Sequence, residues 1–174
     1  MKIQKMILAG GTGFLGQAII ERFSREGTDI VVFSRGENRK EKNVRFIHWD
    51  GKTLGEWAKE LENADVLINL AGKSVDCRYT KQNKEEIISS RVNATKVLGE
   101  AINKTINPPK VWINSASATI YRNAEDQAMD EYTGEVGEGF SVGVCQVWEN
   151  AFNDISNPAT RKIAMRISDR KSVV

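Results

Sequence analysis

The stretch "ILAGGTGFLGQAII" (7–20) constrains the fold of this chain more than any other part of the sequence. Gly10, Gly13 and Gly16 fall three residues apart, between an apolar run and an amphipathic segment. A glycine loop between a strand and a helix is the context of a dinucleotide-binding turn, although the glycine spacing alone also fits a simple turn. In the binding motif, one glycine allows the tight turn, one lets backbone N–H groups approach a pyrophosphate, and one lets helix and strand pack closely. The N-terminus of the helix then faces the phosphates with unpaired N–H donors.

The rest of the chain alternates short apolar runs with longer amphipathic segments. The apolar runs predict strands at residues 2–9, 29–35, 43–49, 64–72, 110–117 and 161–168. The amphipathic segments predict helices at residues 14–27, 53–63 (capped by Thr53), 81–106 and 140–155. Strands that alternate with helices imply right-handed crossovers and a parallel sheet covered on both faces. We therefore expect a single doubly wound α/β domain of the Rossmann type, with strand order 3-2-1-4-5-6.

Composition excludes several classes of function. The 25 basic and 23 acidic residues give a net charge of +2, which is no electrostatic footprint for nucleic acid. No run reaches the roughly 18 apolar residues of a membrane span, and the apolar stretch at the N-terminus is too short for a signal peptide. Cys77 and Cys145 have no metal-ligand spacing and suit a reducing compartment. We expect a cytoplasmic protein that binds neither nucleic acid, membrane nor metal.

The end of the second predicted strand indicates which dinucleotide the loop binds. NAD-binding chains often have Asp or Glu there, which hydrogen-bonds the ribose 2′-hydroxyl. This chain has Ser34 and Arg35 instead, and Arg39 and Lys40 follow closely. A carboxylate would repel a 2′-phosphate, whereas an arginine and a hydroxyl would bind one. The sequence therefore favours NADP(H) over NAD(H), with a solvated basic loop as the alternative.

Several motifs carry a family resemblance: "GGTGFLG" (10–16), "NLAG" (69–72), "SASATIY" (115–121), "VWE" (147–149) and the longer stretch "NLAGKSVDCRYTKQNKEEIISSRVNATKVL" (69–98). The chain resembles the extended short-chain dehydrogenase/reductases over about residues 3–168. Within them it is similar to an atypical subfamily described as nucleoside-diphosphate-sugar epimerase-like, some of whose members carry a cell-division-inhibitor label. The resemblance implies an NADP(H)-binding, epimerase- or dehydrogenase-like protein that acts on a sugar-nucleotide-like substrate.

The resemblance also implies a role for each matching position. The residues that would cradle the pyrophosphate are Gly10, Gly11, Thr12, Gly13, Phe14, Leu15 and Gly16. Ser34 and Arg35 would contact the adenosine phosphate, and Trp49 and Asp50 would lie around the adenine. Leu70, Ala71 and Gly72 would lie under the ribose. Ser115 and Ala116 would lie beside the nicotinamide. Ser117 matches the serine that hydrogen-bonds the reacting carbonyl or hydroxyl.

Arg91, grouped with the cofactor-contacting residues, occupies a position where the extended family often has an asparagine that borders the site. An arginine there could hold a phosphate or carboxylate of the substrate. A solvent-facing helix residue is the alternative.

The sequence departs from the family at the catalytic dyad. Active members carry Tyr-x-x-x-Lys, and alignment on "VWE" places those two positions at Ser141 and Cys145. The i, i+4 spacing keeps both on one helix face. A serine hydroxyl is a far weaker acid than tyrosine, whose reference pKa is about 10, and a neutral thiol supplies no cation. The site assignments are therefore Ser117 as a substrate-orienting residue and Ser141 and Cys145 in the dyad positions.

Whether the chain is an enzyme stays open. The alternative is a catalytically silent nucleotide-binding module or a partner-binding regulator. Cys145 as a nucleophile would need a basic partner, which the sequence does not place nearby. Structural roles are assigned to His48 inside a strand, Tyr121 as a packing residue and Glu149 as a helix-surface carboxylate.

The resemblance ends near Ser168. Family members continue there with a smaller C-terminal domain that covers the substrate, whereas residues 169–174, "DRKSVV", predict an irregular tail. The expected organisation is therefore an NADP-binding domain over residues 1–168 followed by that tail. The oligomeric state stays open, with a homodimer as one option.

Overall fold

The structure, a computed structural model, describes residues 2–168, so the predicted tail lies outside the described residues. Its centre is a seven-stranded sheet of order β3-β4-β2-β1-β5-β6-β7. The strands are β1 (Lys5–Ala9), β2 (Asp29–Ser34), β3 (Arg39–Glu41), β4 (Val44–His48), β5 (Val66–Asn69), β6 (Val111–Ser117) and β7 (Arg161–Ile167). The helices are α1 (Phe14–Ser24), the 3-10 helix η1 (Glu56–Leu61), α2 (Lys81–Lys104), the 3-10 helix η2 (Ala118–Ile120) and α3 (Phe140–Asn153).

The predicted strand order is confirmed. Without β3, the order β4-β2-β1-β5-β6-β7 is 3-2-1-4-5-6, and all neighbouring pairs are parallel. β3 is an addition that pairs antiparallel with β4 at the sheet edge. Its residues are exposed, and Arg39 lies over the Phe46 ring at 3.6 Å and hydrogen-bonds Glu41. The sequence "RKE" contains no apolar residue, so its hydrophobic pattern could not indicate a strand.

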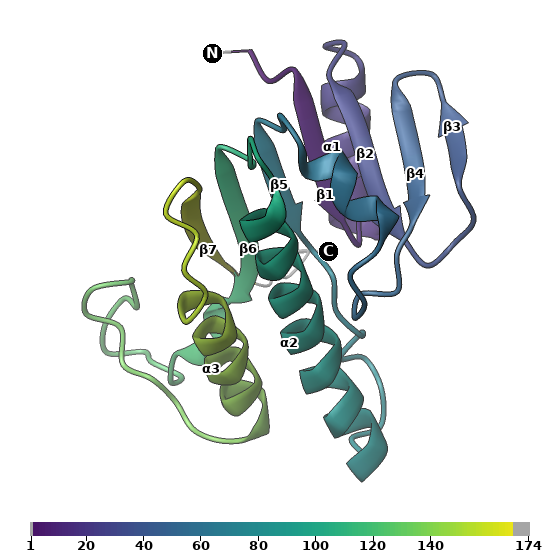
Figure 1. Cartoon of the computed structure of the whole chain (residues 1–174). Coiled ribbons are helices and arrows are strands. Elements are labelled where there is room, and N and C mark those ends of the chain that lie inside the picture. Colours follow the sequence, from purple (N-terminus) through teal and green to yellow (C-terminus); the bar gives the residue numbers. More distant parts are fainter. Residues whose placement is uncertain (1, 169–174) are drawn as a thin grey trace.

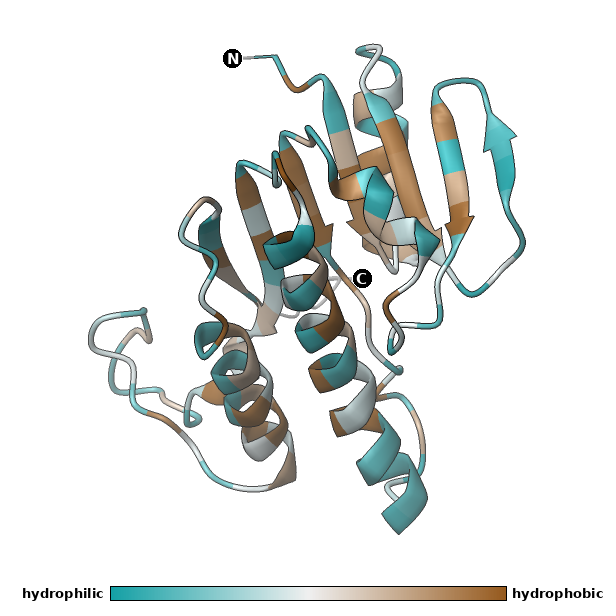
Figure 2. Ribbon diagram, in the orientation of Figure 1, coloured by the Kyte–Doolittle hydropathy of each residue, from teal (hydrophilic) through white to brown (hydrophobic). Residues whose placement is uncertain are grey.

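Helices cover the two faces of the sheet unequally. Figure 1 shows α1 behind the sheet and η1, α2 and α3 in front of it. Side chains of β1 alternate between the faces, so Ile7 and Ala9 join the core under α2, whereas Met6 and Leu8 join the core on the α1 side. In Figure 2 the strands are largely hydrophobic, while β3 and the N-terminal turns of α2 are hydrophilic. Those turns of α2 extend beyond the sheet at its carboxyl edge (Figure 1).

The loop before η1 differs from the prediction. Thr53 does not cap a helix: η1 begins at Glu56, with Gly55 in the N-cap position. The Thr53 hydroxyl donates to Asp50 at 2.7 Å, and its carbonyl accepts the indole N–H of Trp57 at 3.0 Å. Thr53 therefore stabilises the turn after β4, which is an alternative role for a short hydroxyl side chain near a helix start.

A buried polar network joins four elements beneath the carboxyl edge. Asn69 of β5 donates to the side-chain oxygen of Asn114 of β6 at 2.7 Å. The Asn69 amide also donates to the hydroxyl of Thr95 of α2 at 3.4 Å, and that hydroxyl accepts the indole N–H of Trp148 of α3 at 3.1 Å. The side-chain oxygen of Asn69 also accepts the backbone N–H of Ala71 at 3.1 Å. Because each of these buried groups is paired, the network fixes the end of β5 against both helices.

None of the described helices is both long enough and apolar enough to span a bilayer.

Candidate functional site

The carboxyl ends of the central strands meet at one edge of the sheet. The backbone N–H of Gly10, just past β1, donates to the carbonyl of Phe33 in β2 at 2.9 Å. On the other side of β1, the N–H of Leu70 donates to the carbonyl of Ala9 at 2.8 Å. These bonds bring together the loops after β1, β2 and β5, where ligands bind in open α/β sheets.

Each of the three spaced glycines has a separate structural reason. Gly10 has a φ of +74°, and a Cβ there would lie 2.8 Å from the Cα of Ala71. A Cβ on Gly16 would lie only 2.1 Å from the carbonyl oxygen of Gly11, so this glycine allows α1 to pack on the loop. Gly13 has an ordinary φ of −80°, and a Cβ there would meet nothing within 4 Å. The middle glycine therefore faces open space at the start of α1.

No side chain of residues 2–168 caps the N-terminus of α1. Gly13 is its N-cap and offers no side-chain acceptor to the first N–H groups of the helix. Thr12 is exposed, and so are two large apolar side chains beside the loop, Phe14 at 88% and Leu15 at 44%. Unpaired N–H groups and the positive end of the helix dipole together favour a phosphate.

The end of β2 offers a hydroxyl and a cation. The Ser34 hydroxyl is buried and has no hydrogen-bond partner among the described residues. Leaving a buried polar group without a hydrogen-bond partner costs about 1–3 kcal/mol. A rotamer change that brings the Ser34 hydroxyl to a ligand oxygen would offset this cost. Arg35 is exposed and forms no ion pair within residues 2–168. Both groups fit an additional phosphate at this end of a dinucleotide.

Trp49, at the position predicted to contact adenine, is buried. Its side chain is 3% exposed and packs in the core against Phe33 and Trp57, with ring centroids 5.9 and 5.7 Å away. The indole therefore faces the core, and the predicted contact of Trp49 with adenine stays a prediction. The apolar surface of a tryptophan after a strand serves core packing here, and the residue type alone could not distinguish the two roles.

The neighbouring Asp50 is exposed and caps its own turn. Its carboxylate accepts the backbone N–H groups of Lys52 and Thr53, each at 2.8 Å, and the Thr53 hydroxyl. The backbone hydrogen bonds from Thr53 and Lys52 lower the Asp50 pKa to about 2. Its predicted contact with adenine stays a prediction.

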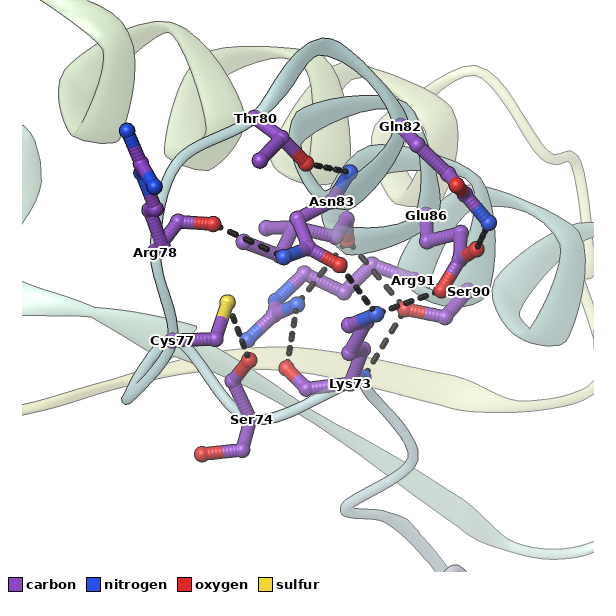
Figure 3. Close-up of polar contacts among 11 residues, drawn as sticks. Lys73, Ser74, Cys77, Arg78, Thr80, Gln82, Asn83, Glu86, Ser90 and Arg91 are labelled. Carbon is purple, nitrogen blue, oxygen red and sulfur yellow. Dashed lines mark hydrogen bonds and ion pairs between the residues drawn. The ribbon is translucent and has the colours of Figure 1, made fainter.

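The loop after β5 is anchored to α2 by polar contacts (Figure 3). The backbone N–H of Lys73 donates to the Ser90 hydroxyl at 2.9 Å, and the Lys73 ammonium contacts Asn83 and Glu86. Thr80 caps α2 by accepting the N–H of Asn83. The sequence did not indicate this anchoring, because it depends on how the loop folds back over the helix.

Arg91 is part of the same arrangement and is only partly exposed. It is half-buried, and its Nη1 donates to the backbone carbonyls of Lys73 and Ile87 at 3.1 and 2.9 Å. Its guanidinium lies over the Trp148 ring at 5.2 Å. A Cβ on Gly72 would lie 3.1 Å from the guanidinium carbon, so the loop passes close to the cation. Arg91 is therefore held against the loop and α3, and its predicted contact with a ligand stays a prediction.

The end of β6 places two of the predicted site residues together. Ser117 lies beside the Cys145 thiol, and its hydroxyl donates to the Thr119 hydroxyl at 2.8 Å. Ser115 and Ala116 are buried just before it, and the Ser115 hydroxyl has no hydrogen-bond partner among the described residues. Ser141 is partly exposed one turn before Cys145 and makes no side-chain hydrogen bond in the described part of the chain.

The electrostatics at Cys145 keep its thiol protonated. Burial and the nearby Glu149 raise the pKa of the Cys145 thiol, although Ser117 and the Arg91 guanidinium act in the opposite direction. The fold therefore does bring a cation from α2 to Cys145, which the sequence could not show. Its effect is too small to produce a thiolate nucleophile.

Glu149 is not the helix-surface carboxylate that the sequence suggested. It is 7% exposed, and Arg166 of β7 binds both of its oxygens at 2.9 and 2.8 Å. Arg166 also donates to the Tyr121 hydroxyl at 2.5 Å, so Tyr121 makes a polar contact and is more than a packing residue. These contacts raise the Arg166 pKa. Glu149 and Arg166 are 17 residues apart, and only the parallel strand arrangement brings them together.

Two remaining predictions concern His48 and metal binding. His48 ends β4 and is exposed, and its backbone N–H donates to the Asn38 side chain at 2.6 Å, in keeping with a structural role. Within residues 2–168 no group of three or more His, Cys, Asp or Glu side chains is arranged to hold a metal ion.

Comparisons with known proteins agree with this geometry. The model of the NAD dependent epimerase/dehydratase family matches residues 6–139. The chain is 34% identical over 163 residues to the epimerase family protein YfhF of Bacillus subtilis, covering 91% of this chain and 52% of that protein. It is 28% identical over 167 residues to the human epimerase family protein SDR39U1, covering 93% of this chain and 53% of that protein. The chain thus spans about half the length of these relatives.

Solved structures show the same fold. The crystal structure of human SDR39U1 (isoform 2) with NADPH has a TM-score of 0.77 at 26% identity, covering 94% of this chain and 53% of that one. MoeE5 in complex with UDP-glucose and NAD has a TM-score of 0.74 at 21% identity, covering 93% of this chain and 53% of that one, a likeness of fold. With its glycine loop, its strand order and a family model that matches most of its length, this chain belongs to the NAD dependent epimerase/dehydratase family.

Proposed function

We propose that this chain binds NADP(H) and forms the cofactor-binding part of an epimerase- or dehydrogenase-like oxidoreductase. The observation that carries the proposal is the geometry of the loop at residues 10–16. Gly13 faces open space at an uncapped helix N-terminus, while Gly10 and Gly16 are required by close packing. The human relative of 26% identity was solved with NADPH, which supports a nicotinamide dinucleotide as the ligand.

The proposed contacts follow the strand ends in order. Backbone N–H groups of the loop, from Gly11, Thr12, Gly13, Phe14 and Leu15, bind the pyrophosphate. Ser34 and Arg35 bind the 2′-phosphate, and this pair is the reason to prefer NADP(H) over NAD(H). Leu70, Ala71 and Gly72 lie under the ribose, and Ser115 and Ala116 beside the nicotinamide. The proposal assigns no contact to the Trp49 indole, which packs in the core.

The chemistry would take place near Ser117. The bound nicotinamide exchanges a hydride with a substrate, and the Ser117 hydroxyl orients the reacting carbonyl or hydroxyl of that substrate. The sequence resemblance suggests a sugar-nucleotide-like substrate. We expect the rest of such an enzyme, as in relatives about twice as long, to contribute to substrate binding.

A catalytically silent nucleotide-binding module is the second candidate function. It is favoured by Ser141 and Cys145 in the dyad positions and by the raised thiol pKa of Cys145. Neither residue supplies the usual proton carrier or cation, and loss of such proton transfer typically lowers a rate by about 10²–10⁴-fold. A partner-binding regulator, a cytoplasmic location and a homodimer stay predictions.

Calorimetric titration with NADPH and NADH tests the proposal. We expect saturable binding of NADPH and weaker binding of NADH. Arg35→Asp should weaken NADPH binding by about 10–150-fold, because a charge-assisted hydrogen bond is worth about 1.5–3 kcal/mol, and should leave NADH binding nearly unchanged. Arg25→Asp is the matched control, because Arg25 is exposed at the C-cap of α1 and pairs with Glu21. Equal affinities, or tighter NADH binding, would contradict the proposed preference.

A further inference from the structure

Arg91 is a half-buried cation without an acidic partner among residues 2–168. Both hydrogens of its Nη1 are used by the carbonyls of Lys73 and Ile87. Its Nε and Nη2 donate to no group in the described part of the chain. Neither nitrogen is among the buried side-chain atoms that lack a partner, so both keep surface open to a ligand. The free Nε–Nη2 edge is a fork that binds a carboxylate or phosphate with two parallel hydrogen bonds.

The surroundings hold this cation in place without neutralising it. Trp148 packs against the guanidinium, and Gly72 leaves room for it beneath the loop. The neighbouring carboxylate of Glu86 is already bound by the Lys73 ammonium, as Figure 3 shows. Burial lowers the Arg91 pKa, and the neighbouring Cys145 thiol, whose own pKa is raised, supplies no negative charge at pH 7. A partly buried charge is retained at a cost unless it is paired, and no carboxylate of residues 2–168 pairs with this one.

We propose that Arg91 binds an oxyanion of the substrate, either a carboxylate or a phosphate. The inference rests on the proposed function and deepens it by naming the charge of the substrate. Arg91 and Ser117 are both neighbours of Cys145, which places the proposed anion near the reacting group. The phosphates of NADP(H) are assigned to the loop after β1 and to the end of β2, whereas Arg91 lies against α3 and the loop after β5. The substrate is therefore the source of this oxyanion.

The arginine Nε–H resonance of Arg91, observed by NMR in ¹⁵N-labelled protein, reports on this contact directly. The chain is first saturated with NADP⁺ and then titrated with inorganic phosphate and, separately, with oxalate. We expect NADP⁺ to leave the Arg91 Nε–H signal almost in place and each oxyanion to move it in a saturable way. In Arg91→Gln, the oxyanion affinity measured from the shifts of the Gly72 and Lys73 amides should fall at least about tenfold. This is the effect of losing one charge-assisted hydrogen-bonded pair.

Arg25→Gln is the control and should leave these shifts unchanged, because Arg25 pairs with Glu21 on α1. Arg91→Lys keeps a charge without the fork and should bind oxyanions less tightly than the wild type. Shifts that do not saturate, or that persist in Arg91→Gln, would overturn the inference. So would saturation of Arg91 by NADP⁺ alone, because the anion would then be the cofactor's. If NADP⁺ does not bind at all, the proposed function fails, and the same titrations without cofactor still decide whether Arg91 binds an anion.

Discussion

Substitutions at Gly13 and Gly16 should separate cofactor binding from stability. A Cβ on Gly16 would lie 2.1 Å from the Gly11 oxygen and 2.4 Å from its carbonyl carbon, which are backbone atoms that cannot rotate away. Overpacking of this kind typically costs about 1–3 kcal/mol. Each kcal/mol shifts Tm by about 2–4 °C in a chain of this size, so Gly16→Ala should lower Tm by about 2–12 °C.

Gly13 should behave in the opposite way. Its φ of −80° is accessible to any residue, and a Cβ there meets no atom within 4 Å. The free energy of unfolding of Gly13→Val should therefore stay within about 0.5 kcal/mol of the wild type, as for other surface substitutions. The added side chain stands where the pyrophosphate must approach the backbone. Loss of even one charge-assisted hydrogen bond, worth about 1.5–3 kcal/mol, lowers NADPH affinity by about 10–150-fold.

Circular dichroism melting curves and calorimetry with NADPH measure the two effects on the same samples. Gly13→Ala, with a smaller side chain, should bind NADPH more tightly than Gly13→Val and melt at the same temperature. A folded Gly13→Val with wild-type affinity would mean that the loop is only a turn. A Gly16→Ala variant with unchanged Tm would refute the packing argument for the third glycine.

Other predictions follow from the polar groups. Thr95→Val removes the acceptor of the buried Trp148 N–H and should lower the free energy of unfolding by about 1–3 kcal/mol in urea titrations; no change would mean that the indole finds another acceptor. Cys145, 5% exposed and with a raised pKa, should resist iodoacetamide at pH 7–8 while Cys77 reacts, as peptide mass spectrometry can measure; rapid labelling of native Cys145 would contradict this. The Asp50 pKa of about 2 lies below its unfolded value, so the carboxylate stabilises the fold above about pH 4, and this stabilisation is lost as the pH falls through 2. Because Asp50 is exposed, Asp50→Asn should cost only about 1 kcal/mol or less at pH 7, and the difference from the wild type should vanish near pH 2.

The sequence predicts the fold correctly where the hydrophobic pattern and the rules of strand connection point to the same arrangement. The strand order followed from alternating elements and right-handed crossovers, and the three glycines were assigned from their spacing between a strand and a helix. β3 was missed because an exposed edge strand needs no apolar residues. Thr53 was misassigned because a hydroxyl before a helix can equally serve a turn.

Side-chain partners at the site could not be predicted in the same way. The helical pattern around Glu149 predicts a surface carboxylate. Its burial depends instead on Arg166, which lies on a strand that follows later in the chain. Trp49 matched a family position, yet the direction of its side chain depends on its packing with Phe33 and Trp57. Arg91 has backbone carbonyls as partners, and these leave no pattern of residue types in a sequence.

A crystal structure of the chain soaked with NADPH tests the central claim most directly. The account predicts electron density for the pyrophosphate within hydrogen-bonding distance of the backbone N–H groups at the start of α1, and for the 2′-phosphate beside Ser34 and Arg35. Density for the dinucleotide at another face, or none at millimolar NADPH with the loop accessible in the lattice, would contradict it.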